Sequence, residues 1–190
     1  MTFPSNYDPE NPFALQDQLE YFKISSDIIN SSPVFQVNAL TSDFYYQAGM
    51  LYRAKELGFP VKYQELGNEF YLEDKNYYIK YPSVHQYAEE ANKWAGLIKL
   101  HPGFSNIKCA ALSAFSYGQN DYGRRKLLNK CLLDEMKEFE NNGTLNIDAF
   151  TIHQYIGSGV TGTGSGVMTL AQVQSMLSEP FISLAGLQNN

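Results

Sequence analysis

The stretch Val61-Lys62-Tyr63-Gln64-Glu65-Leu66-Gly67-Asn68-Glu69 decides the fold, because it predicts a short β-strand lying between two amphipathic helices. Before it, apolar side chains recur at helical spacing at Ala48, Leu51, Ala54 and Leu57. After it, a second helical stripe is formed by Tyr87, Ala91, Trp94 and Ile98. A strand with a helix on each side is the repeating unit of α/β proteins.

The same alternation runs along the rest of the chain. Further strands are predicted at 33–40, 106–112 and 145–155, and further helices from about 13 to the mid-twenties, over about 124–140, and after Thr169. Parallel neighbours need crossover connections of about a dozen residues or more, so strict alternation predicts an α/β fold with about four parallel strands. Ser83 with Gln86 is expected to form a capping box, and the Tyr-rich segment before it is expected to be a loop.

Composition limits the classes of partner. The chain has 190 residues, 44% of them apolar, and a formal net charge of −6, which argues against nucleic acid as the main partner. Its 14 Tyr and 12 Phe are the ring types that stack on sugar faces, although most are expected to be core residues. The sequence has no stretch long and apolar enough for a membrane span and no signal peptide; if the parent protein is secreted, this chain does not carry the address.

Metal and cofactor chemistry is not indicated. The two cysteines, Cys109 and Cys131, have no metal-ligand spacing with the histidines. Gly157, Gly159 and Gly162 fit the dinucleotide pattern G-x-G-x-x-G, but the next helix is predicted several residues too late to hold a pyrophosphate. We therefore expect no metal and no cofactor, and interpret that segment as a loop over the site. A nucleotide-binding domain is the weakest of three alternatives.

Two carboxylates on one strand need an explanation. Strand side chains alternate between faces, so Glu65, Gly67 and Glu69 are expected to share one side of the sheet. A carboxylate turned inward is costly unless it is paired or catalytic. Taken alone, the pattern fits either a structural ion pair or a general acid/base.

The string Glu65-Leu66-Gly67-Asn68-Glu69 resembles the fourth-strand signature of clan A (β/α)8-barrel glycoside hydrolases. It is most similar to the heparanase and β-glucuronidase group, and next to the α-L-arabinofuranosidases. The resemblance implies that Glu69 is the general acid/base, kept protonated by aromatic neighbours such as Phe70 and Tyr71, and that Asn68 binds the sugar 2-hydroxyl.

The resemblance extends to both sides of this strand. Residues 150–155 are similar to the sixth barrel strand, which implies that His153 and Tyr155 point into the sugar pocket. Residues 33–40 resemble the third strand, with Asn38 near its carboxyl end. Tyr71 completes the substrate-binding set that we expect for an oligosaccharide or glycoside substrate.

The resemblance covers about strands three to six, so it implies a partial (β/α)8 barrel in a single domain. A lead-in helix (1–32) precedes four strands with their crossovers (33–155), and a Gly-rich loop with the last helix follows (156–190). In these retaining enzymes a second carboxylate attacks the anomeric carbon, and no strand that would supply it is recognised here. The expected function is thus that of a glycoside hydrolase fragment whose open sheet edges invite self-association. The alternative is a non-catalytic carbohydrate-binding or interaction protein.

Overall fold

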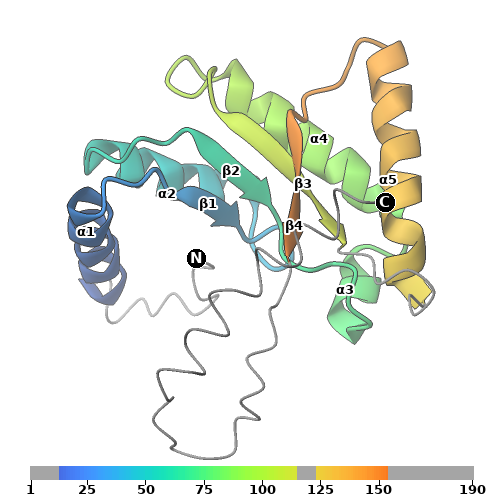
Figure 1. The fold of residues 1–190 in the computed structure, drawn as a ribbon, viewed down its shortest axis with the longest axis horizontal. Coiled ribbons are helices and arrows are strands. Elements are labelled where there is room, and N and C mark those ends of the chain that lie inside the picture. Colours follow the sequence, from blue (N-terminus) through green and yellow to red (C-terminus); the bar gives the residue numbers. More distant parts are fainter. Residues whose placement is uncertain (1–12, 115–122, 154–190) are drawn as a thin grey trace, which may run out of the picture. The chain divides into compact units, whose positions relative to one another are not determined.

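The structure, a computed structural model, describes residues 13–114 and 123–153, with side chains from residue 19 onward. It is an α/β fold with a four-stranded sheet and helices between consecutive strands (Figure 1). The elements are α1 (Phe13–Ile28), β1 (Val34–Val37), α2 (Phe44–Glu56), β2 (Tyr63–Leu66), α3 (Lys75–Lys80), α4 (Val84–Leu100), β3 (Lys108–Ala114), α5 (Gly123–Asn141) and β4 (Ala149–His153).

The sheet is parallel throughout and its strand order is β1-β2-β3-β4. Gln36 pairs with Glu65, Glu65 with Ala110, and Ala110 with Ala149. Side chains at paired positions lie on the same face, and the period of two adds Thr151 to that face. The predicted parallel sheet is confirmed.

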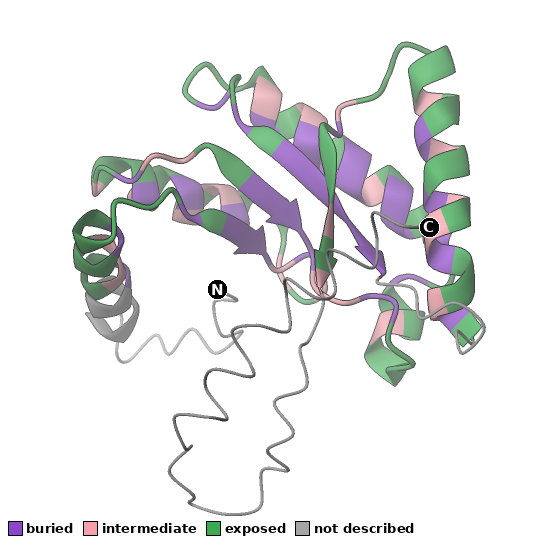
Figure 2. Ribbon diagram, in the orientation of Figure 1, coloured by how far each residue is buried: buried purple, intermediate pink, exposed green. Residues whose placement is uncertain are grey.

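Helices pack against the opposite face of the sheet. Helices α2 and α4 pass behind the strands in Figure 1, and α4 contacts both β2 and β3. The side chains of β1, β2 and β3 on this face are almost fully buried, whereas Phe150 and Ile152 on β4 are 40% and 57% exposed, and Figure 2 shows the same contrast between β4 and the other strands. Those with 0–1% exposure are Val37, Gln64, Leu66, Cys109 and Ala111. They pack against apolar side chains of α2, α4 and α5, and together these residues form the hydrophobic core. The helix side chains include Leu51, Ala88, Ala95 and Leu128.

Two helix starts follow from their caps. The Asp43 carboxylate accepts a hydrogen bond from the Tyr46 amide at 2.8 Å, and Ser83 with Gln86 forms the predicted capping box at the start of α4. Each cap satisfies backbone N–H groups that the first helical turn leaves without partners.

The segment between β2 and α4 differs from its prediction. It was expected to be a loop, but it contains α3, which begins after Asp74, whose side chain accepts the Asn76 amide at 2.7 Å. Its six residues include two tyrosines, which have only modest helix propensity, so the sequence pattern gave no helical signal. Strand β2 is also shorter than predicted, because it ends at Leu66 rather than at Glu69.

Asp148 fastens β4 to β3. Its backbone amide donates to the Cys109 carbonyl at 2.8 Å, and its carboxylate accepts the Cys109 amide at 2.8 Å. Lys99 and Lys108 also reach this carboxylate, at 2.7 and 3.2 Å. Asp148 therefore joins the two strands one residue before their paired positions begin at Ala110 and Ala149.

The chain divides into two units, residues 1–153 and residues 154–190. The second unit lies outside the described residues, and so do the predicted Gly-rich loop, the Thr169 helix and Tyr155.

Candidate functional site

The backbone turns sharply where β2 ends. Gly67 has φ +108°, and Glu69 has φ +48°, a left-handed conformation that is uncommon for a residue with a side chain. A Cβ atom on residue 67 would overlap the ring of Phe70, so both the conformation and the space at this position require glycine. The turn carries Asn68 and Glu69 away from the line of the strand.

Tyr87 contacts the end of β2 just before this turn. Its hydroxyl, on α4, donates to the Leu66 carbonyl at 2.8 Å and accepts the Leu112 amide at 2.6 Å. These two backbone groups belong to neighbouring strands, so the hydroxyl bridges β2 and β3 at the end of β2. Burial raises the pKa of the Tyr87 phenol well above its ordinary value, which keeps the bridging hydroxyl un-ionised.

Phe70 anchors the other side of the turn. It is 1% exposed and meets Tyr77, Tyr81 and Tyr87 at ring-centroid distances of 4.8 to 5.3 Å. The edge-to-face geometry of these contacts is favourable for aromatic pairs. Residues 67–70 are thus held between an aromatic cluster and the sheet.

A hydrogen-bonded group of polar side chains lies at the carboxyl ends of the strands, and we call it the two-carboxylate cluster. Its members are Gln36 from β1, Glu65 from β2, Asn68, Glu69 and Tyr71 from the segment after β2, and Thr151 and His153 from β4.

Glu65 is at the centre of this cluster and its side chain is 8% exposed. Its Oε1 accepts the Thr151 hydroxyl at 2.6 Å and lies 2.8 Å from Nε2 of His153, while its Oε2 accepts from Gln36 Nε2 at 3.2 Å. Three side chains from two other strands therefore satisfy a buried carboxylate, as burial of a charge demands.

The contacts of Glu65 cross an intervening strand. Thr151 and His153 are on β4, whereas Glu65 is on β2, and β3 lies between them. Alternate strands of a sheet are about 9.6 Å apart, so the long Glu65 side chain reaches over β3 to meet Thr151 and His153.

Glu69 joins the cluster through His153 and Tyr71. The Tyr71 hydroxyl donates to Glu69 Oε1 at 3.0 Å, and Nδ1 of His153 lies 3.3 Å from the same oxygen. The Glu69 side chain is 12% exposed and the His153 side chain 23%, so the imidazole between the two glutamates stays partly accessible. The Arg125 guanidinium lies over the Tyr71 ring, 4.8 Å from its centroid.

Asn68 is held next to Glu69 by two partners. Gln36 Nε2 donates to Asn68 Oδ1 at 3.0 Å, and the Tyr77 hydroxyl makes a hydrogen bond with the same side chain. Burial raises the pKa of Tyr77, an effect that the hydrogen bond to Asn68 only partly offsets.

The structure brings together four of the six predicted site residues: Asn68, Glu69, Tyr71 and His153. Asn38 is used elsewhere, because its Oδ1 accepts the Leu40 and Thr41 amides and its Nδ2 donates to the Thr41 hydroxyl. Its side chain closes the turn after β1, as Asn side chains commonly do. Tyr155 lies outside the described residues.

Three residues of the cluster were not predicted as site residues. The prediction that Glu65 shares a face with Glu69 was the signal that could have identified it. Gln36 and Thr151 face the cluster because of the strand register, which the sequence alone does not reveal.

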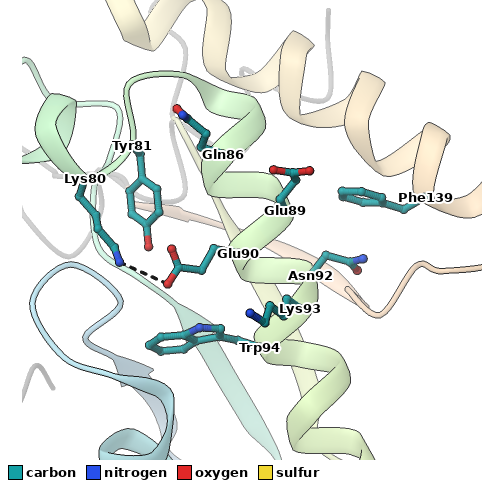
Figure 3. A pocket seen from close by; sticks show the side chains of 9 residues that line it. All are labelled: Lys80, Tyr81, Gln86, Glu89, Glu90, Asn92, Lys93, Trp94 and Phe139. Atoms are coloured by element: carbon teal, nitrogen blue, oxygen red, sulfur yellow. Dashed lines mark hydrogen bonds and ion pairs between the residues drawn. The ribbon is translucent and has the colours of Figure 1, made fainter.

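A separate pocket of about 730 Å³ lies over α4 (Figure 3). Its wall includes the Lys80–Glu90 ion pair, at 3.4 Å. The lining residues are Lys80, Tyr81, Gln86, Glu89, Glu90, Asn92, Lys93, Trp94 and Phe139. None of them belongs to the cluster, and we take the cluster as the candidate functional site because it combines buried, interacting acid and base groups.

Comparisons of the chain with protein-family models, curated proteins and solved structures give no match. Among residues 13–114 and 123–153, no helix is both long and apolar enough to cross a membrane. The same part of the chain contains no group of three or more His, Cys, Asp or Glu side chains with the geometry to hold a metal ion.

Proposed function

We propose that this chain forms part of a retaining glycoside hydrolase of the (β/α)8 type and that Glu69 is its general acid/base. One observation carries the proposal: Glu69, three residues after the end of β2, lies within hydrogen-bond distance of Tyr71 and of His153 at the end of β4. An acid/base carboxyl is expected where parallel strands end, because α/β folds build their sites at that edge.

The strand order supports a partial barrel. Parallel crossovers are almost always right-handed, so a sheet whose strands follow in sequential order carries its helices on one face. A doubly wound sheet reverses its order and carries helices on both faces. The order β1-β2-β3-β4 agrees with a section of a barrel wall, and the contacts of Glu65 across β3 lie on the face that would be the barrel interior.

In the proposed reaction Glu69 transfers its proton to the glycosidic oxygen as the bond to the anomeric carbon breaks. It later removes a proton from the water that completes hydrolysis. Tyr71 and His153 position the Glu69 carboxyl through Oε1, and Asn68, held by Gln36, is the proposed partner of the sugar 2-hydroxyl. Hydrogen bonds to that hydroxyl strengthen in the transition state.

Glu65 does not suit the role of nucleophile. Both of its oxygens accept hydrogen bonds, from Thr151, His153 and Gln36, and its side chain is 8% exposed. In a retaining enzyme the nucleophilic carboxylate must be free to bond to the anomeric carbon, and it lies about 5 to 5.5 Å from the acid/base carboxyl. We propose that it comes from a strand outside the described residues.

The test is hydrolysis of aryl glycosides by this chain and by the product of its complete gene, each with and without Glu69→Gln. We expect the variant to lose about 10²–10⁴-fold in kcat with a poor leaving group, because the glutamine cannot supply a proton. With 2,4-dinitrophenyl glycosides the loss should be much smaller, because that leaving group departs without protonation.

Glu90→Gln is the matched control, since it makes the same chemical change in the pocket of Figure 3. Its activity should equal that of the unchanged protein. Loss of activity in Glu90→Gln but not in Glu69→Gln would mean that the catalytic site is the pocket and not the two-carboxylate cluster. If this chain and the product of its complete gene bind sugar but neither hydrolyses it, the result would instead support a carbohydrate-binding protein.

A further inference from the structure

His153 lies between two carboxylates, and this arrangement limits where its protons can be. Glu65 Oε1 is 2.8 Å from Nε2, and Glu69 Oε1 is 3.3 Å from Nδ1. A carboxylate only accepts hydrogen bonds, so an ionised Glu65 requires a proton on Nε2. Nδ1 then either accepts a proton from a neutral Glu69 carboxyl or donates one to an ionised Glu69.

Glu65 is well suited to hold this proton in place. Thr151 and Gln36 fix its carboxylate, and it is more deeply buried than Glu69. The shorter of the two contacts to His153 is also the one from Glu65. This is the arrangement in which a buried carboxylate orients a histidine so that its other nitrogen faces a reacting group.

We propose that Glu65 is a positioning residue that fixes the Nε2–H tautomer of His153, so that Nδ1 exchanges a proton with Glu69. In the exchange the O–H bond of the Glu69 carboxyl breaks and an N–H bond forms at Nδ1. The neutral carboxyl becomes a carboxylate and the imidazole becomes an imidazolium. The three groups together keep one net negative charge in both states, so no proton has to enter or leave the cluster.

This inference rests on the proposed role of Glu69, and other titratable groups surround the pair. Tyr71 donates to Glu69 Oε1, Arg125 lies over the Tyr71 ring, and Tyr77 interacts electrostatically with Glu69. These groups face Glu69, whereas Glu65 is the charged partner on the Nε2 side of His153. Substitution of Glu65 should therefore alter the imidazole specifically.

The experiment is ¹⁵N NMR of the histidine side chains across pH in the full chain. Signals of His153 are assigned by their loss in His153→Gln, which leaves those of His85 and His101. In the unchanged protein the neutral form should be the Nε2–H tautomer. In Glu65→Gln the neutral ring should become a mixture of the Nε2–H and Nδ1–H tautomers, because a glutamine amide can either accept a hydrogen bond from Nε2 or donate one to it.

Thr151→Val is the matched control, since it removes a hydrogen bond of Glu65 but leaves the charge. It should change the tautomer mixture less than Glu65→Gln does. An Nδ1–H tautomer in the unchanged protein would overturn the proposal, and this measurement needs no variant to fold. An unaltered Nε2–H tautomer in folded Glu65→Gln would overturn it as well.

Activity separates this inference from the proposed function. Hydrolysis that depends on Glu69 but keeps the same pH–rate profile in Glu65→Gln would overturn the role of Glu65 alone. If the NMR results are as expected but no hydrolysis is found, the tautomer assignment would hold and the proposed glycoside hydrolase function would be refuted.

Discussion

Tyr87→Phe tests whether the hydroxyl at the end of β2 holds two strands together. The variant keeps the buried ring and removes only the oxygen that bridges the Leu66 carbonyl and the Leu112 amide. Both backbone groups would then be buried without their partner. Since each of these two groups costs about 1–3 kcal/mol, we expect the free energy of unfolding to fall by about 2–6 kcal/mol.

Urea denaturation followed by circular dichroism measures this loss, with an unchanged slope showing that the denatured state is unaffected. For a chain of this size the melting temperature should fall by roughly 4–24 °C. Amide exchange at Leu112 should accelerate more than at distant strand positions, because that N–H loses its acceptor.

Tyr45→Phe is the control for the Tyr87 variant, because Tyr45 is 83% exposed on α2. It should change stability by no more than about 0.5 kcal/mol, the range of ordinary surface substitutions. An equally small loss in Tyr87→Phe would refute the bridging role. It would imply that the backbone groups of β2 and β3 find other hydrogen-bond partners without the hydroxyl.

Two further predictions concern Asp148 and Glu69. Burial raises the pKa of the Asp148 carboxyl, but hydrogen bonds led by that from Lys99 outweigh it and lower the pKa. Asp148→Asn should therefore cost about 1–2 kcal/mol near neutral pH. Titrated urea melts should show the difference shrinking as pH falls below about 4, because the carboxyl of the unfolded chain is protonated there while the native carboxylate still resists protonation. At Glu69, φ +48° favours glycine, so Glu69→Gly should be as stable as Glu69→Ala or up to about 1 kcal/mol more stable. A more stable alanine variant would disprove strain at this position.

Periodicity and cap residues predicted most of the fold. The four strands and the parallel sheet follow from apolar spacing, and the start of α4 follows from Ser83 and Gln86, whose interactions are local in sequence. Helix α3 was missed because its stability depends on Asp74 and on packing around it rather than on an apolar stripe. Local patterns are reliable where the determining contacts are also local.

The site was predicted less completely because its contacts are long-range. Glu65 meets Thr151 and His153, which are 86 and 88 residues away in sequence, and a contact between β2 and β4 across β3 cannot be read from a single strand. The prediction that Glu65 and Glu69 share a face assumed one continuous strand. The strand in fact ends at Leu66, and Glu69 returns to the same face through the turn at Gly67.

Two departures from ordinary folding preferences coincide at this turn. Glu69 adopts a left-handed backbone conformation, which costs about 1–2 kcal/mol for a residue with a side chain. Glu65 buries a carboxylate that only a full set of hydrogen-bond partners makes tolerable. A sequence under selection for stability alone would place glycine at 69 and an apolar residue at 65. Strain that the surrounding structure maintains is typical of functional sites, and here Tyr87, Phe70 and Gly67 all act to maintain it.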